Sequence, residues 1–150
     1  MLRMSTKGRY GLRAMIDLAE AYNEGQHPVM MGDIAKRQEL SRKYLHALLT
    51  SLKQAGLVDA VRGAKGGYYL AKRPEEINVS DILIALEGEI FVVNCVKDNV
   101  RCNRRGHCRA HQVWVELNRT IHRMLDGVAL SSLLGTDRDP LEELNVSGSE

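Results

Sequence analysis

Three absences restrict what this 150-residue chain can be. No apolar run approaches the roughly 20 residues that a helix needs to cross a bilayer, and the N-terminus lacks the pattern of a signal peptide. Cysteine is scarce, and its odd count of three agrees with a reducing compartment. We therefore expect a cytoplasmic protein with no membrane partner, and its 44 % apolar residues are enough to form a core.

Signatures of catalysis and nucleotide binding are missing as well. The glycine-rich segment 62–67 lacks the Gly-Lys-Ser/Thr ending and the following helix of a phosphate-binding loop. No pattern indicates a cysteine–histidine pair in a cleft, and a chain of this length leaves little room for one. We expect a protein that is not an enzyme, with an enzyme that uses an exposed cysteine as nucleophile as the alternative of a different class.

Positive charge is concentrated in the first half of the chain. Residues 1–73 hold 13 Lys and Arg against 6 Asp and Glu, a net charge of +7, whereas residues 74–150 have a net charge of −5. This division favours a polyanionic partner for the first half. A solvated, lysine-rich surface is the plainer explanation.

Helical periodicity organises the first half of the chain. Apolar residues recur at helical spacing over about residues 9–23, with Ser5 or Thr6 near the start of this helix. A second, shorter helix fits residues 31–37, and a third begins at Ser41, whose side chain is suited to cap it. The last two helices, joined by about three residues, predict a helix-turn-helix.

The third helix has two distinct faces. Its inward face holds Leu45, Leu48, Leu49 and Leu52. Polar residues crowd its first turn and a half, namely Arg42, Lys43, Tyr44 and His46. The start of a recognition helix is the part that reaches base edges in the major groove, so these four are candidate DNA-reading residues. An ordinary exposed helix face is the alternative.

Two short alternating segments follow, at residues 57–61 and 68–70, and Gly56 separates them from the third helix. The hairpin that they predict has a basic, glycine-rich tip, in which Arg62, Gly63 and Lys65 can approach phosphates or enter a minor groove. Such a hairpin has the shape of a wing. The predicted fold is mainly α with a small β-hairpin wing, a winged helix-turn-helix that binds double-stranded DNA.

The second half predicts a helix near residues 80–87, closed by Gly88, and a long amphipathic helix over residues 109–126. The apolar stripe of the long helix comprises Val113, Trp114, Leu117, Ile121, Met124 and Leu125. Its length favours packing against a second copy of the chain, although packing on its own domain is the alternative. We therefore divide the chain into a DNA-binding domain at 1–73, a cluster loop and dimerisation helix at 74–135, and an acidic tail at 136–150, expected to be disordered.

The stretch Cys95-x6-Cys102-x5-Cys108-x2-His111 contains every cysteine of the chain. Four soft or borderline ligands in one polar loop predict a metal ion or a cluster. Structural zinc sites usually begin with a tight cysteine knuckle, which is missing, whereas iron–sulfur clusters tolerate wider loops. An iron–sulfur cluster is favoured, with zinc and a metal-free set of reduced thiols as alternatives, and His107 is the rival to His111 as the fourth ligand.

Several motifs together resemble the Rrf-type winged-helix regulators over roughly residues 1–135. They are the opening Ser5-Thr6-Lys7-Gly8-Arg9-Tyr10-Gly11-Leu12, Ile34-Ala35, Ser41-x2-Tyr44-Leu45, Gly56-Leu57-Val58 and Arg62-Gly63-x2-Gly66-Gly67-Tyr68. The cysteine loop resembles the cluster-binding branch represented by the iron–sulfur assembly regulator IscR. The resemblance implies a homodimeric transcription factor that carries a 2Fe-2S cluster on Cys95, Cys102, Cys108 and His111, with iron–sulfur status, redox or a related stress as its signal.

Two other branches supply alternatives. The nitric-oxide-responsive 4Fe-4S repressors of the NsrR type have a similar loop, but they use an N-terminal aspartate where Arg9 stands in this chain. The cysteine-metabolism repressors of the CymR type resemble the N-terminal half and lack the cysteine triad. The chain also departs from IscR itself, because its first cysteine gap is six residues rather than five, and because His46 and Ala47 replace a Glu-Gln pair in the recognition helix. Its operator sequence therefore stays open.

Overall fold

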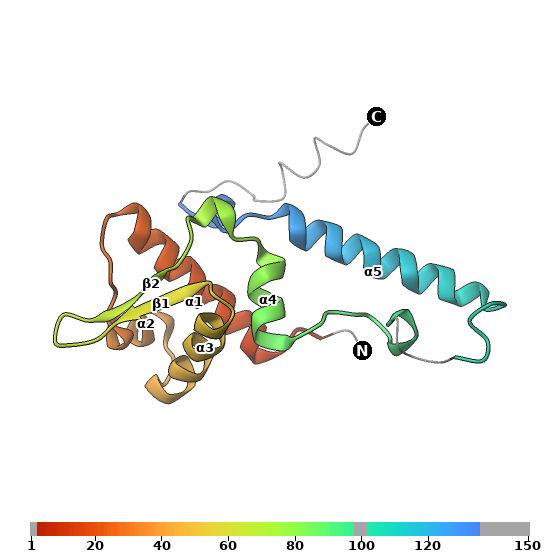
Figure 1. The fold of residues 1–150 in the computed structure, drawn as a ribbon, viewed down its shortest axis with the longest axis horizontal. Helices are drawn as coiled ribbons and strands as arrows, with labels where there is room; N and C mark the ends of the chain where they lie inside the picture. The colour runs from red at the N-terminus through yellow and green to blue at the C-terminus, as the bar shows by residue number, and fades with distance from the viewer. Residues whose placement is uncertain (1–2, 98–101, 136–150) are drawn as a thin grey trace.

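The computed structural model describes residues 3–97 and 102–135, so the predicted acidic tail lies outside the described residues. Five α-helices and one two-stranded sheet follow one another along the chain (Figure 1). They are α1 (Thr6–Asn23), α2 (Met31–Gln38), α3 (Arg42–Gln54), β1 (Val58–Val61), β2 (Gly67–Leu70), α4 (Val79–Glu87) and α5 (Arg109–Gly127). Short 3-10 helices occupy Pro74–Glu76 (η1), Asn94–Val96 (η2) and Leu130–Leu133 (η3). The mainly helical class with a β-hairpin is confirmed.

Helix α1 begins at Thr6, three residues before the start that apolar periodicity predicts. Ser5 caps it, because its Oγ accepts a hydrogen bond from the amide of Lys7 at 3.1 Å. The carboxylate of Glu87, at the end of α4, accepts two further bonds from the amides of Ser5 and Gly8, both at 3.1 Å. The periodic pattern starts at Leu12 and gives no signal for a cap that another helix completes.

The helix-turn-helix consists of α2 and α3. Glu39 ends α2 with a left-handed backbone at φ 55°, and Ser41 begins α3 by accepting a hydrogen bond from the amide of Tyr44 at 3.1 Å. The predicted inward face of α3 is confirmed, since Leu45, Leu48, Leu49 and Leu52 are all buried. The opposite face is exposed to solvent.

The wing is the antiparallel pair of β1 and β2, with Val58 opposite Leu70 and Val61 opposite Gly67. A third segment joins it at Val29, whose amide and carbonyl both bond to Tyr68 at 2.8 Å. This approach requires glycine at position 67, because a Cβ there would collide with the backbone carbonyl of Val29. The end of β2 nearest the wing tip is therefore fixed to the chain that leads into α2.

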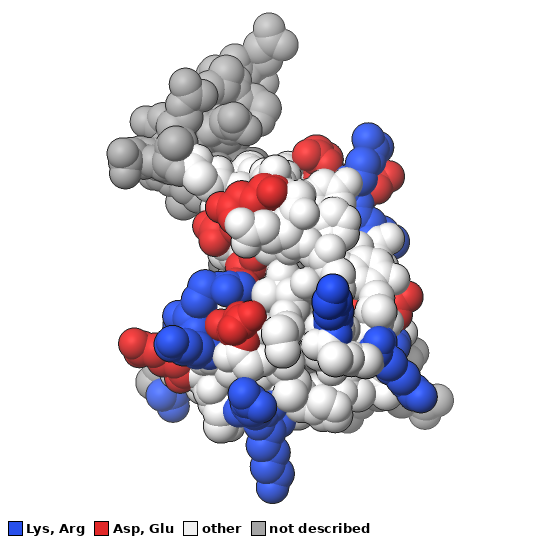
Figure 2. All heavy atoms as spheres, turned by 90° about the vertical axis from the view of Figure 1, so that its left-hand side faces the viewer, with Lys and Arg blue, Asp and Glu red and all other residues white. Residues whose placement is uncertain are grey.

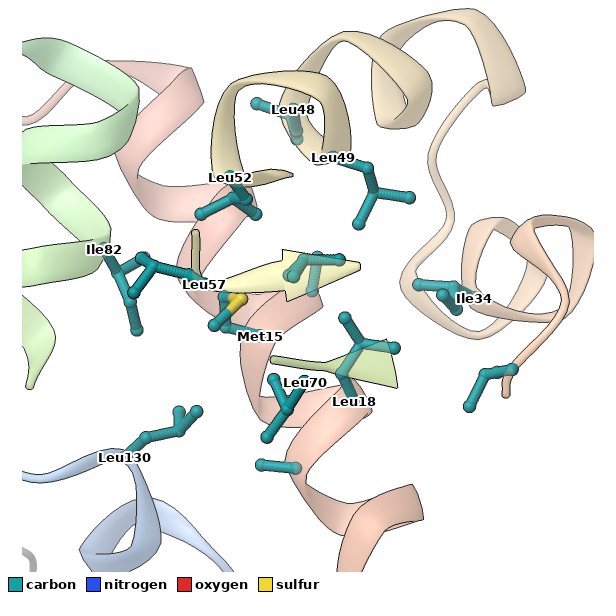
Figure 3. Close-up of a cluster of buried hydrophobic side chains, with 14 of the residues drawn as sticks. Met15, Leu18, Ile34, Leu48, Leu49, Leu52, Leu57, Leu70, Ile82 and Leu130 are labelled. Carbon is teal, nitrogen blue, oxygen red and sulfur yellow. The ribbon is translucent and has the colours of Figure 1, made fainter. Parts of the chain in front are cut away.

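One hydrophobic core lies between α1, α3, α4 and the wing (Figure 3). It includes residues from both halves of the chain, and the labelled ones are Met15, Leu18, Ile34, Leu48, Leu49, Leu52, Leu57, Leu70, Ile82 and Leu130. Ile77 and Leu86 are also buried there. The residues before and after position 73 thus contribute to the same core.

Helix α5 extends away from this lobe, and the chain segment between α4 and η2 runs beside it (Figure 1). None of its residues is buried. Where α5 returns to the lobe, Leu125 packs on a small second cluster of Val79, Leu83 and Val128. No helix among the described residues is both long enough and apolar enough to cross a membrane.

Candidate functional site

A groove of about 970 Å³ lies between α2, α3 and the wing. Five Lys, Arg or His side chains line it, namely Lys36 of α2, Arg42, His46 and Lys53 of α3, and Arg62 of the wing. Asp33 is the acidic residue in the lining. Figure 2 views this end of the molecule and shows Lys and Arg side chains projecting from it beside some acidic ones. A groove with this charge beside a recognition helix is suited to the phosphates and base edges of a duplex.

The structure brings four of the seven predicted DNA-binding residues together in the groove. Arg42 and His46 line it from α3, and Arg62 and Gly63 line it from the wing. Arg42 crosses the start of α2 closely, since a Cβ on Gly32 would lie 2.7 Å from its Nη2. Glycine at position 32 therefore lets this guanidinium lie between the two helices.

The other three predicted residues lie outside the groove lining. Lys43 and Lys65 are exposed, on the first turn of α3 and at the tip of the wing. Tyr44 is half-buried, and its ring meets that of Tyr10 edge-on, with the centroids 6.1 Å apart. Tyr44 thus links the recognition helix to α1.

Sequence reasoning missed Lys36 and Lys53 as lining residues. Lys53 lies in the last turn of α3 and forms an ion pair with Asp59 of the wing, at 3.4 Å. The backbone amide of Ala60 and then Lys53 lower the pKa of Asp59 below its ordinary value. The helical spacing of Lys53 on the polar face of α3 could have identified it as a lining residue. Lys36 comes next to the groove only because α2 packs beside α3.

The four predicted metal ligands lie along the far end of the molecule. Cys95 is in η2, Cys102 is exposed just before the turn at residues 103–107, Cys108 precedes the first residue of α5, and His111 is in its first turn. The amide of His111 donates to the carbonyl of Cys108 at 3.2 Å. Within residues 3–97 and 102–135, no three His, Cys, Asp or Glu side chains are gathered closely enough to hold a metal ion.

The chemistry of these four side chains fits an iron–sulfur cluster. All three cysteines are free thiols, and none is fully buried. Cys108 and His111 lie at the N-terminus of α5, where the helix dipole favours anionic thiolates and a negatively charged group. Three thiols and one imidazole match an incompletely thiolate-ligated cluster as well as a zinc set.

The chain that leads to Cys95 is fastened to α5 by two hydrogen bonds. The amide of Val92 donates to Oδ1 of Asn118 at 3.1 Å, and Nε2 of His122 donates to the carbonyl of Ile90 at 2.7 Å. Neither Asn118 nor His122 belongs to a recognisable sequence motif, and both were missed. Their role appears only when the segment and the helix are side by side.

Comparison with known proteins identifies the family. Residues 4–136 match the Rrf2 family model, described as an iron-dependent transcriptional regulator. The regulator IscR of Aliivibrio salmonicida is 37 % identical over 133 residues, which is 89 % of this chain and 77 % of that protein. Among solved structures, IscR of T. potens is 35 % identical with a TM-score of 0.71, covering 99 % of this chain and 93 % of the other. CymR, the global cysteine regulator of B. subtilis, is 38 % identical with a TM-score of 0.74, covering 91 % and 100 %.

These relatives confirm two predictions from the sequence. The resemblance to Rrf-type regulators and to IscR is borne out, and the relatives are named as transcriptional regulators rather than enzymes. The relatives include both IscR and CymR, and what these two share is regulation of transcription. With its winged helix-turn-helix and basic groove, the chain belongs to the Rrf2 family of DNA-binding transcriptional regulators.

Proposed function

We propose that this protein is a homodimeric transcriptional regulator whose affinity for its operator depends on a labile iron–sulfur cluster held by Cys95, Cys102, Cys108 and His111. The observation that carries the proposal is the donor set, which consists of three free thiols and one imidazole, with Cys108 and His111 at the N-terminus of α5. A bound cluster would supply sensitivity to iron, oxidants or nitric oxide. A 2Fe-2S cluster fits three thiolates and one histidine, and a 4Fe-4S cluster is the alternative.

The DNA-binding half of the proposal rests on the groove. In this proposal His46 and Arg42, which line the groove from the first half of α3, contact base edges, and Lys43 and Tyr44 lie beside them in the chain. Arg62, Gly63 and Lys65 of the wing, together with Lys53, contact phosphates. Phosphate contacts set the affinity and its dependence on salt, whereas base contacts set the sequence preference.

Dimerisation is supported by the exposed apolar stripe of α5. Val113 is 59 % exposed, and Trp114, Leu117 and Met124 are each about two-fifths exposed. A row of large apolar side chains on a projecting helix is typical of a surface that packs against another chain. A second copy is the partner, because two recognition helices are needed to read paired half-sites.

For a cluster to control DNA binding, the dimer must have two arrangements. One of them must bind the cluster better than the other does. On typical coupling energies of about 1–3 kcal/mol, loss of the cluster changes operator affinity roughly 5- to 150-fold. The cluster-free regulator is the second candidate function, favoured by the 38 % identity to CymR and by the finding that no three of the four candidate ligands are gathered in the described part of the chain. The two candidates make opposite predictions for the purified protein.

The test is to purify the protein without oxygen and to measure iron, acid-labile sulfide, visible absorption and operator affinity. We expect a coloured protein, loss of colour in Cys95→Ala, Cys102→Ala and Cys108→Ala, and different affinities for holo and apo protein. Stoichiometric zinc without visible absorption after reconstitution with iron and sulfide contradicts the cluster. Equal affinities at every operator contradict sensing, and a colourless dimer that still binds DNA identifies the cluster-free regulator.

A further inference from the structure

The segment of residues 89–97, called the strap below, runs antiparallel to α5 in a defined register. Ile90 is bonded to His122 and Val92 is bonded to Asn118, so two residues of the strap correspond to four residues of the helix. Two extended residues span about 6.6 Å, and four helical residues rise about 6 Å. The two spacings agree, so the strap lies nearly parallel to the helix axis.

Beyond Val92 the strap turns back on itself. Cys95 follows Val92 by three residues and lies in the 3-10 helix η2, which packs on α5. Val96 and Lys97, which come just after Cys95, line one hollow of about 370 Å³ with Asn118 and His122. The strap therefore holds the segment that carries Cys95 against α5 near Asn118, and His111 lies seven residues, a rise of about 10.5 Å, nearer the start of the helix.

The face of α5 also matches. His111, Val115, Asn118 and His122 are half-buried and recur at intervals of three and four residues, which places them on one face of the helix. Gln112, Glu116, Arg119 and Arg123 are exposed and share a different, polar face. The strap therefore covers the face that carries the candidate ligand, and it leaves the polar face free.

Lys97 closes the strap on itself beyond Cys95. Its Nζ lies 4.1 Å from the centroid of the Phe91 ring and 3.9 Å from Oε2 of Glu89. A cation over an aromatic face and an exposed ion pair are each weakly stabilising. Cys95 thus lies within a loop that is fastened at both ends.

We propose that Asn118 and His122 are positioning residues, which fasten the strap to α5 and so fix the segment that presents Cys95 for cluster binding. The inference rests on the proposed cluster function, and it assigns roles to two side chains that no ligand motif contains. Asn118 acts through its carbonyl oxygen and His122 through its Nε2–H group. Neither residue touches the cluster in this scheme.

The first arm of the test is independent of any cluster. Hydrogen exchange of the Val92 amide is measured in full-length apo protein carrying Asn118→Leu, Asn118→Asp or Gln112→Leu. We expect exchange about fivefold faster in Asn118→Leu, the ratio that corresponds to the net worth of one hydrogen bond. Asn118→Asp keeps an acceptor and should restore protection, and Gln112→Leu makes the same amide-to-leucine change on the polar face and should leave protection unchanged.

The second arm measures the half-life of the visible absorption of reconstituted protein in the presence of an iron chelator. Asn118→Leu and His122→Leu should shorten it severalfold, with Asn118→Asp and Gln112→Leu close to wild type. An unchanged half-life in Asn118→Leu and His122→Leu, or an unchanged Val92 exchange rate in Asn118→Leu, overturns the inference while the cluster function stands. A wild-type chain that acquires no cluster overturns both, and that outcome is distinguished by the wild-type measurement alone.

Discussion

Asp17 of α1 and Arg37 of α2 form a two-pronged ion pair. Nη2 of Arg37 lies 2.6 Å from Oδ1 of Asp17, and its Nε lies 2.9 Å from Oδ2. Gln38 donates a third hydrogen bond to Oδ2 at 2.9 Å, and the carboxylate is only 4 % exposed. The bond to Asp17 raises the pKa of Arg37 above its ordinary value. The pair fastens the first helix of the helix-turn-helix to α1.

Replacing Asp17 should destabilise the protein strongly. Asp17→Ala removes the acceptor of three hydrogen bonds, and bonds to a charged group contribute about 1.5–3 kcal/mol each before the freed donors find water. Arg37 is half-exposed and regains water, so we expect a total loss of about 2–3 kcal/mol in the free energy of unfolding. Urea unfolding measures it. Glu20→Ala, an exposed change on the same helix, is the control, and equal effects of the two variants would contradict a role for the pair.

The start of β2, next to the wing tip, should not tolerate a side chain at position 67. Gly67→Ala places a methyl group against the carbonyl of Val29, a backbone atom that moves only with its whole segment. We expect a loss of about 1–3 kcal/mol, typical of overpacking, together with weaker operator binding. Gly106→Ala is the matched control, because a Cβ at that exposed position meets no atom within 4 Å. Thermal unfolding and gel-shift titration test both variants.

Contacts to phosphates should appear in the salt dependence of DNA binding. Removal of one phosphate contact reduces the slope of log affinity against log salt by about 1. We expect this for Arg62→Ala and Lys53→Ala, and we expect His46→Ala to change the preferred sequence more than the slope. Arg73→Ala is the control, since Arg73 is bonded to Glu76 and lies outside the groove lining. Unchanged slopes in both Arg62→Ala and Lys53→Ala would rule out this docking of DNA in the groove.

A charge in the apolar stripe of α5 should break the proposed dimer. Leu117→Asp places a carboxylate where the partner helix packs, and burying an unpaired charge is strongly unfavourable. Sedimentation velocity should show a monomer. Gln112→Asp adds the same charge on the polar face and should remain dimeric. If Leu117→Asp is also dimeric, another surface joins the two copies.

Replacing His111 with cysteine should prolong the life of the cluster. Full thiolate ligation lowers the reduction potential and removes the more weakly bound ligand. His111→Cys should therefore remain coloured and lose its absorption more slowly than wild type when exposed to air. If His111→Cys loses its absorption faster than wild type, the prediction is wrong. If His107→Ala also loses its absorption faster, His107 contributes to the site.

Local signals in the sequence predicted the elements whose structure depends on residues close together along the chain. The leucine face of α3, its cap at Ser41 and the glycine-rich wing each arise within one segment, so periodicity and turn residues reveal them. The contacts that the sequence did not reveal join distant segments. Glu87 caps a helix 79 positions away at Gly8, and Asn118 fastens Val92. Single polar residues of this kind carry no periodic signal, because only the packing of other elements makes them neighbours.

The shared core has a consequence for how the protein unfolds. Ile77, Ile82 and Leu130 come from the part of the chain that carries the candidate sensor, yet they are buried with Met15 of the DNA-binding part. Cutting the chain at residue 73 would expose that apolar surface to water. The DNA-binding part and the residues after position 73 that share its core should therefore unfold as one cooperative unit. A lesion in either part should lower the same melting temperature, so variants need a stability measurement before any loss of regulation is attributed to signalling.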